Sequence, residues 1–144
     1  MTVSYADAEP SGLAEMLGGL VEQNLAAHPS RRRLLRPALV VIEAHDAQVA
    51  VALRFRVGSL EVAGAPAPGA PAPEAHLRIG ASSSRLLELV RAPLRCGLPD
   101  VLQRDGRAVL ADIARGRVRI SGLLCHPVRL RRLTMVLNVH EGSR

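Results

Sequence analysis

Aromatic side chains are almost absent from this chain. Tyr5 and Phe55 are the only two, tryptophan is missing, and aromatic residues make up 1% of a sequence that is 48% hydrophobic. The core must therefore be built from Leu, Val, Ile and Ala. Proteins that hold unpaired bases stack them on Phe, Tyr or Trp, so the composition disfavours nucleic acid as a partner.

Motifs that carry chemistry are missing as well. The two cysteines, Cys96 and Cys125, are too few for a disulfide framework and favour a reducing compartment. The histidines lack the paired spacing of zinc sites, and no phosphate-binding glycine loop is present. We therefore expect no catalytic residue, no metal and no cofactor, and a protein that is not an enzyme.

Long apolar runs are also lacking. No stretch reaches the ~20 residues that a helix needs to cross a bilayer. The N-terminus has no basic segment followed by an apolar run, which a secretory signal would show. These features predict a soluble protein in the cytoplasm.

Positive charge is abundant, and all of it is arginine. The 19 basic residues outnumber the 13 acidic ones, which gives a net charge of +6. Such a surface attracts polyanions, including anionic membranes. Five arginines are predicted on the outward face of strands, namely Arg54, Arg56, Arg78, Arg117 and Arg119. They either dock on a phosphate-rich surface or serve solubility and protect the sheet from edge pairing.

Hydrophobic spacing predicts both helices and strands. Ser11 is a suitable N-cap for a helix over Leu13–Ala27, and apolar residues alternate strictly in a strand over Val49–Arg56. The same criteria predict further strands at Ala38–Ala44, Ser59–Ala63, Ala75–Ile79 and Arg117–Ser121, and further helices at Ser82–Arg91, Asp105–Ala114 and His126–Val139. This order favours an α+β fold with a five-stranded, mostly antiparallel sheet covered on one face by helices.

The sequence predicts a single domain. Residues 1–10 are interpreted as a flexible leader and residues 11–141 as the domain. Within it, Gly64–Pro73 consists only of Gly, Ala and Pro. Proline cannot donate to a strand ladder, so this segment is interpreted as a loop insertion in a hairpin connection.

Several short segments, taken in order, resemble one known family. A strand turns at Gly58, a second strand enters a helix that begins at small polar residues, and a strand of alternating basic and apolar residues precedes a final amphipathic helix. The segments are Val51–Val62, Leu77–Gly80, Ser84–Leu89, Ala114–Gly122, Leu123–Pro127 and Leu130–Leu133. In this order they resemble the sterol carrier protein-2 family of lipid-transfer domains.

The resemblance implies a five-stranded sheet and helices that enclose an apolar tunnel. Such domains bind sterols, fatty acyl chains, phospholipids or isoprenoid compounds without altering them, and no catalytic residue carries over. The expected lining comes from inward-facing positions, namely Val51, Leu53, Phe55, Leu77, Ile79, Leu86, Leu89, Val118, Ile120, Leu133, Val136 and Leu137.

Other functions stay open, because a tightly filled core would show the same alternation. The chain could be an interaction module that binds an anionic partner through its arginine face. It could also be an accessory domain of a lipid-modifying enzyme. Its basic surface suits transient contact with an anionic membrane, and its apolar C-terminal helix could support a homodimer.

Overall fold

The computed structural model describes residues 2–71, 74–91, 94–95, 98–99, 107, 111–121 and 127–137. Residues 111–114 are helical. The other elements, in chain order, are β1 (Thr2–Tyr5), α1 (Gly12–Ala27), the 3-10 helix η1 (Pro29–Leu34), β2 (Ala38–Ala44), β3 (Val49–Arg56), β4 (Ser59–Gly64), β5 (Leu77–Ala81), α2 (Ser83–Arg91), β6 (Leu94–Arg95), β7 (Leu98–Pro99), β8 (Arg119–Ser121) and α4 (Pro127–Leu137).

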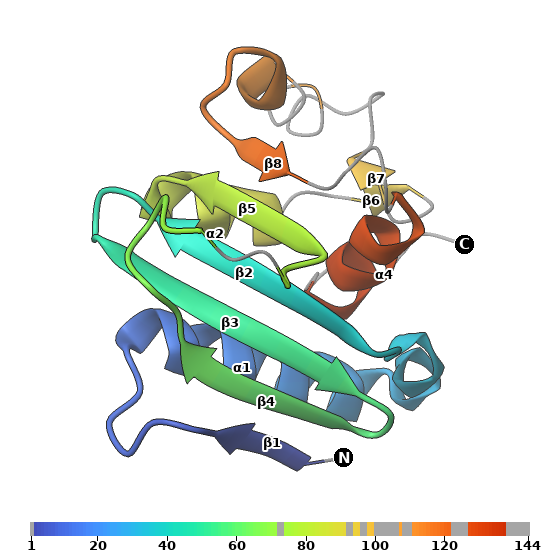
Figure 1. Cartoon of the computed structure of the whole chain (residues 1–144). Helices are drawn as coiled ribbons and strands as arrows, with labels where there is room; N and C mark the ends of the chain where they lie inside the picture. Colours follow the sequence, from blue (N-terminus) through green and yellow to red (C-terminus); the bar gives the residue numbers. More distant parts are fainter. Residues whose placement is uncertain are drawn as a thin grey trace.

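The main sheet has six strands and is mixed, which corrects the expectation of five mostly antiparallel strands. Its order is β1-β4-β3-β2-β5-β8, and a separate ribbon is formed by β6 and β7 (Figure 1). β3 runs antiparallel to both β2 and β4, and β8 runs antiparallel to β5. The pairs β1–β4 and β2–β5 are parallel. The α+β class is confirmed.

The sixth strand lies where a flexible leader was expected. Thr2–Tyr5 adds to the edge of the sheet beside β4. The Tyr5 hydroxyl lies where a Cβ at Gly18 would stand, on the buried side of α1. The glycine, which costs a helix stability, therefore gives the tyrosine room to contact α1.

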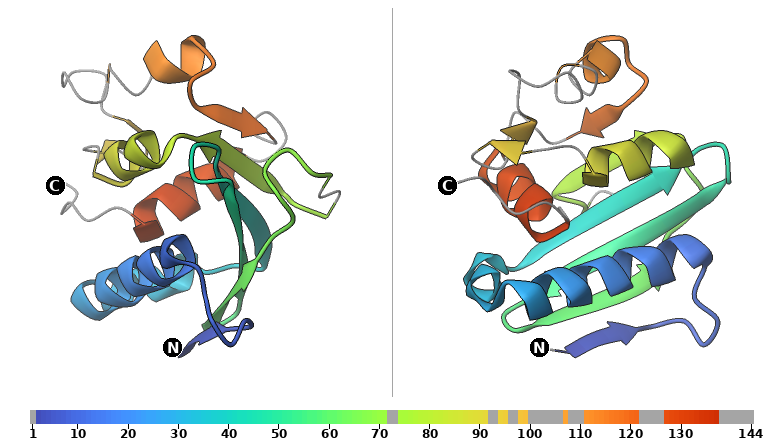
Figure 2. Two further views of the ribbon diagram at one scale, coloured as in Figure 1. Left: turned by 90° about the vertical axis from the view of Figure 1, so that its left-hand side faces the viewer. Right: turned by 180° about the vertical axis from the view of Figure 1, so that it is seen from behind.

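The segment rich in Pro and Ala connects β4 to β5, and these two strands are not neighbours. Two strands, β3 and β2, lie between them. The segment is therefore a crossover rather than the hairpin connection we expected. It lies on the sheet face away from the helices (Figure 2). Val41 and Ala50, whose side chains point to this face, are buried. A crossover is what parallel strands require.

The helices cover the other face of the sheet, as predicted (Figure 2). α1 contacts β3, β4, η1 and α4. Register places alternate residues of the central strands on this inner face. The buried inner-face side chains are Val40, Ile42, Ala44, Val51, Leu53, Phe55, Leu60, Val62, Leu77, Ile79 and Ala81. The core is thus aliphatic, with Phe55 as its aromatic member.

Side-chain oxygens cap two helices. The Ser11 hydroxyl accepts a hydrogen bond from the Ala14 N–H, which confirms the predicted start of α1. The first turn of α2 is capped from outside, because Asp46 Oδ1 accepts bonds from the backbone N–H and the hydroxyl of Ser83, at 2.8 and 2.9 Å. These bonds, the backbone one first, lower the pKa of Asp46.

Adjacent glycines in α1 provide a stability test. Gly19 has open space at its Cβ position, so Gly19→Ala should raise the free energy of unfolding by about 0.5–1 kcal/mol, the usual penalty of a helical glycine. Gly18→Ala should gain less or lose stability, because the methyl group collides with the Tyr5 hydroxyl. Urea unfolding measures both.

Tyr5→Phe removes that hydroxyl and supplies the control. In this background, Gly18→Ala should be more favourable than in the unmodified chain. It should still fall short of Gly19→Ala, because ring carbons of residue 5 lie 3.0 and 3.2 Å from the Cβ position of Gly18. Equal effects of the two alanine substitutions in the unmodified chain would show that Tyr5 does not constrain α1.

Candidate ligand pocket

The side chains predicted to line a ligand site lie mainly in one apolar interior. Ten of them are buried, namely Val51, Leu53, Phe55, Leu77, Ile79, Leu86, Val118, Leu133, Val136 and Leu137. Ile120 is partly buried against the same core. The side chain of Leu89 lies outside the described part of the structure. The inward-facing positions were therefore predicted correctly as core, and their contact with a ligand stays a prediction.

A small pocket lies at the end of this interior where η1, the start of β2 and α4 meet. Four of the predicted lining residues, Phe55, Leu77, Leu133 and Val136, contribute to it. Its other walls are Leu35, Arg36, Pro37, Ala38, Val40, His76 and Arg132. Its volume of about 30 Å³ holds only one or two water molecules. This pocket is therefore much too small for a lipid chain.

A larger, open groove adjoins the pocket. It has a volume of about 510 Å³ and shares Pro37, Ala38, Phe55 and His76 with the pocket. Arg54, Arg56 and Glu74 make its other side polar. A volume of roughly 300–1,000 Å³ is usual for small-molecule sites, but this groove opens broadly to solvent. It is better suited to surface contact than to enclosing an apolar ligand.

His76 lies between the pocket and the groove, and it holds the start of β2. Its backbone N–H donates to the Leu39 carbonyl at 2.9 Å, and its Nδ1 accepts from the Leu39 N–H at 3.0 Å. The ring thus continues the β2–β5 ladder beyond the last strand pair. This satisfies backbone groups that would otherwise be unpaired next to an apolar pocket.

One buried hydrogen bond fixes α4 above the pocket. The Asn24 side-chain amide, on α1, donates to the Val136 carbonyl at 2.9 Å. The last four carbonyls of a helix have no partner within the helix, so Asn24 caps α4 across a sequence separation of 112 residues. Asn24 is only 6% exposed. Val136 also lines the pocket, so this bond fixes α4 to α1 at the pocket wall.

The five arginines predicted on the sheet face do not form a uniformly free stripe. Arg56 pairs with Glu61 at 3.4 Å, Arg78 with Glu43 at 3.3 Å, and Arg117 with Asp112 at 3.1 Å. Arg54 and Arg119 are exposed. Because three of the five charges have internal partners, the face is less cationic than the sequence predicts.

Glu43, near the end of β2, has a structural role. It is 4% exposed on the sheet face covered by the crossover. Its Oε1 lies 3.3 Å from the Arg78 guanidinium and accepts from the Gly69 N–H, while Arg78 donates to the Ala70 carbonyl. These contacts tie the crossover to the sheet.

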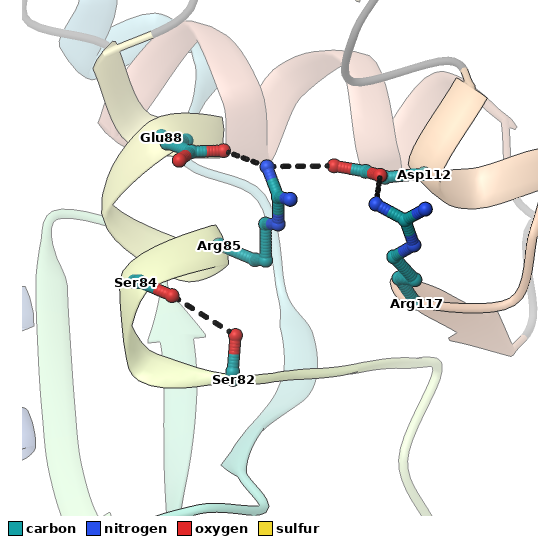
Figure 3. A network of polar contacts seen from close by, with 6 residues as sticks. All are labelled: Ser82, Ser84, Arg85, Glu88, Asp112 and Arg117. Carbon is teal, nitrogen blue, oxygen red and sulfur yellow. Dashed lines mark hydrogen bonds and ion pairs between the residues drawn. The ribbon is translucent and has the colours of Figure 1, made fainter.

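A second polar network joins α2 to residues 111–118 (Figure 3). Arg85 contacts Glu88 at 2.6 Å and Asp112 at 3.0 Å, and Arg117 contacts the other oxygen of Asp112. The Glu88 hydrogen bond, followed by the Asp112 charge, raises the pKa of Arg85. The Asp112 carbonyl also accepts from the Arg117 and Val118 N–H groups. Two arginines neutralise the charge of the buried Asp112 carboxylate, and the Asp112 carbonyl holds the backbone of the turn before β8. The network therefore stabilises this turn.

Within the described ranges, no three His, Cys, Asp or Glu side chains gather as metal ligands. None of the helices in the same ranges is long and apolar enough to cross a membrane. Cys96 and Cys125 lie outside the described residues.

Sequence reasoning missed several walls of the pocket. Val40 alternates inward in a strand that was predicted correctly, and this alternation was the signal that could have found it. Arg36 and Arg132 gave no such signal, because charged residues are expected to face water and only the meeting of η1 with α4 brings them to the pocket. The strand predicted at Ala75–Ile79 includes His76, but the structure begins β5 at Leu77, and His76 precedes it and contacts β2.

The similarity of this chain to known proteins lies in its fold. No protein-family model and no curated protein matches the chain. A solved structure named "UbiJ-SCP2 Ubiquinone synthesis protein" is similar, with a TM-score of 0.56, 16% sequence identity, and coverage of 87% of this chain and 92% of that one. The chain therefore has a sterol carrier protein-2-like fold, as the sequence resemblance predicted.

The bond from Asn24 to α4 can be tested with an isosteric substitution. Asn24→Leu leaves the Val136 carbonyl buried and unpaired, so the free energy of unfolding should fall by about 1–3 kcal/mol. Gln23→Leu makes the same chemical change at an exposed neighbour, and it should change stability by less than about 0.5 kcal/mol. Urea unfolding compares them, and equal losses would disprove a capping role for Asn24.

Proposed function

We propose that this protein binds an apolar ligand, of the fatty acyl, phospholipid, isoprenoid or sterol-like class, without altering it. The main support is the apolar pocket between β2, β3, β5 and α4 within a sterol carrier protein-2-like fold. Burial of apolar surface would supply the affinity, at roughly 25 cal/mol per Å². In this proposal the protein is a cytoplasmic carrier and not an enzyme.

Ligand entry requires α4 to move. The pocket of about 30 Å³ cannot hold a lipid chain, so a tunnel would open only as Leu133 and Val136 withdraw from the sheet. α4 buries four apolar side chains on its inner side, and one hydrogen bond from Asn24 of α1 holds it in place. In the proposal, the ligand takes the place of contacts between α4 and the inner face of β2 and β5.

The small volume of this pocket also favours the alternative of an interaction module for an anionic partner. The open groove beside the pocket, with Arg54 and Arg56 in its wall, supports this alternative. The two functions differ in one measurable property. A carrier takes up a molar equivalent of lipid in the interior, whereas a module binds its partner with the interior unchanged.

Lipid uptake is the decisive measurement. Native mass spectrometry after gentle purification should show co-purified lipid, or stoichiometric uptake of a fatty acid, an isoprenoid quinone or a sterol. The quinone is the first probe to use, because the structural neighbour is named for ubiquinone synthesis. A protein that carries no lipid and takes up none of these probes would overturn the carrier function.

A matched pair of substitutions tests the position of the site. Ala38→Leu fills the pocket, and Ala63→Leu adds the same atoms to the outward side of β4. Ala38→Leu should weaken uptake at least about tenfold, equivalent to about 1.4 kcal/mol, while Ala63→Leu should leave it unchanged. Thermal unfolding of both variants separates ligand loss from misfolding. Equal effects on uptake would place the ligand elsewhere.

A further inference from the structure

Charge is distributed unevenly along the strands, between two ends of the molecule. We call one end the η1 end, formed by η1, the residues up to Ala38, and the β3–β4 turn at Arg56–Ser59. These parts are adjacent, because Ala38 pairs with Phe55 and one groove is lined by Pro37, Ala38 and Arg56. The opposite end contains the β2–β3 turn and the start of α1.

Arginines gather at the η1 end. Arg32, Arg33 and Arg36 are exposed, and Arg31 and Arg132 are partly exposed. Arg36 and Arg132 lie at the pocket, and Arg54 and Arg56 in the adjoining groove. Three acidic side chains lie at or near this end, namely Glu22 on α1, Glu74 in the groove and Glu61, which pairs with Arg56.

The opposite end is acidic instead. Asp7 and Glu9 precede α1, Glu15 lies in its first turn, and Asp46 lies in the β2–β3 turn. The described residues thus place positive charge at the η1 end and negative charge at the opposite end. An anionic surface attracts the η1 end and repels the other end.

An apolar side chain projects from the same arginine-rich end. Val57, at the tip of the β3–β4 turn, is 78% exposed, the highest exposure among the large hydrophobic residues described. A single exposed valine is common on protein surfaces. Here it stands next to Arg56 and close to η1, and this combination of basic and apolar groups is suited to the headgroup region of a bilayer.

We infer that the η1 end docks on an anionic lipid bilayer, with arginines against the phosphates and Val57 inserted between headgroups. The choice of a bilayer over another polyanion rests in part on the proposed function, because the pocket opens at this end and its ligand would be dissolved in lipid. Bases would find no aromatic platform here, since Phe55 is buried and Tyr5 lies on β1.

The docking differs from the sheet-face contact expected from the sequence. The sheet-face arginines Arg78 and Arg117 form ion pairs within the molecule. Arg32 and Arg33, in contrast, lie in η1 and were not among the arginines predicted on the sheet face. Docking through the η1 end also brings the pocket to the membrane surface. A lipid could then pass between bilayer and pocket without crossing water.

Vesicle sedimentation tests the docking with ligand-free protein. The protein should bind vesicles of phosphatidylcholine and phosphatidylglycerol in equal parts, and it should release them as salt is raised. It should not bind phosphatidylcholine alone. Arg32→Gln with Arg33→Gln should weaken binding roughly 25-fold, about fivefold for each arginine near an anionic surface.

Arg115→Gln with Arg119→Gln is the matched control, because it removes two exposed arginines outside the η1 end. It should weaken binding by less than about fivefold. Equal losses in the two double variants would show that only net charge matters and would overturn the docking surface. Thermal unfolding of both double variants confirms that they remain folded.

Val57→Ser separates a bilayer from a soluble polyanion. It should weaken vesicle binding several-fold and leave binding to a single-stranded oligonucleotide unchanged. If the oligonucleotide binds more tightly than the vesicles through Arg32 and Arg33, the partner is a polyanion and the bilayer inference is wrong.

The docking and the proposed function fail separately. Uptake of a monomeric quinone or fatty acid by the Arg32 and Arg33 variant, in the absence of vesicles, should match that of the unmodified protein. In the unmodified protein, vesicle binding without uptake would count against the carrier alone. Uptake by the unmodified protein without any binding to anionic vesicles would overturn the docking alone.

Discussion

The pairing of β2 with β3 determines which side chains of the central sheet meet the helices. Val40 lies opposite Leu53 and Ile42 opposite Val51, so the aliphatic residues of both strands face α1 and α4. A shift of one residue would move this whole set to the other face. The parallel addition of β5 to β2 continues the same alternation through Leu77 and Ile79. The pocket, the core and the position of α4 all follow from this register.

Local patterns were sufficient to predict most elements and their inward faces. The limits of β2 were predicted to the residue, and Ser11 was identified as the cap of α1. The partners of the strands were not predictable from local patterns. β1 carries only four residues and joins β4 from a distance of more than fifty residues, while the crossover before β5 resembles an ordinary hairpin loop until its destination is known.

The candidate site was predictable only in its apolar part. Alternation identified Phe55, Leu77, Leu133 and Val136, because burial follows the period of a strand or helix. The arginines at the pocket and the contacts of Glu43, His76 and Asn24 depend on segments that are distant in sequence. Such polar contacts have no period. In this protein they fix the crossover to the sheet, the start of β2 to His76, and α4 to α1.

The cap that Asn24 places on α4 has a consequence for synthesis of the chain. Strands β1 to β4 and helix α1 are complete within the first 64 residues, but the Val136 carbonyl and the inner side of α4 are made only with residues 127–137. Until then the aliphatic face of β2 lacks the cover that α4 provides, and exposed aliphatic surface promotes aggregation of partly made chains. The strands of this sheet are therefore synthesised well before the helix that shields them, and the interval between the two is when the chain is most exposed to aggregation.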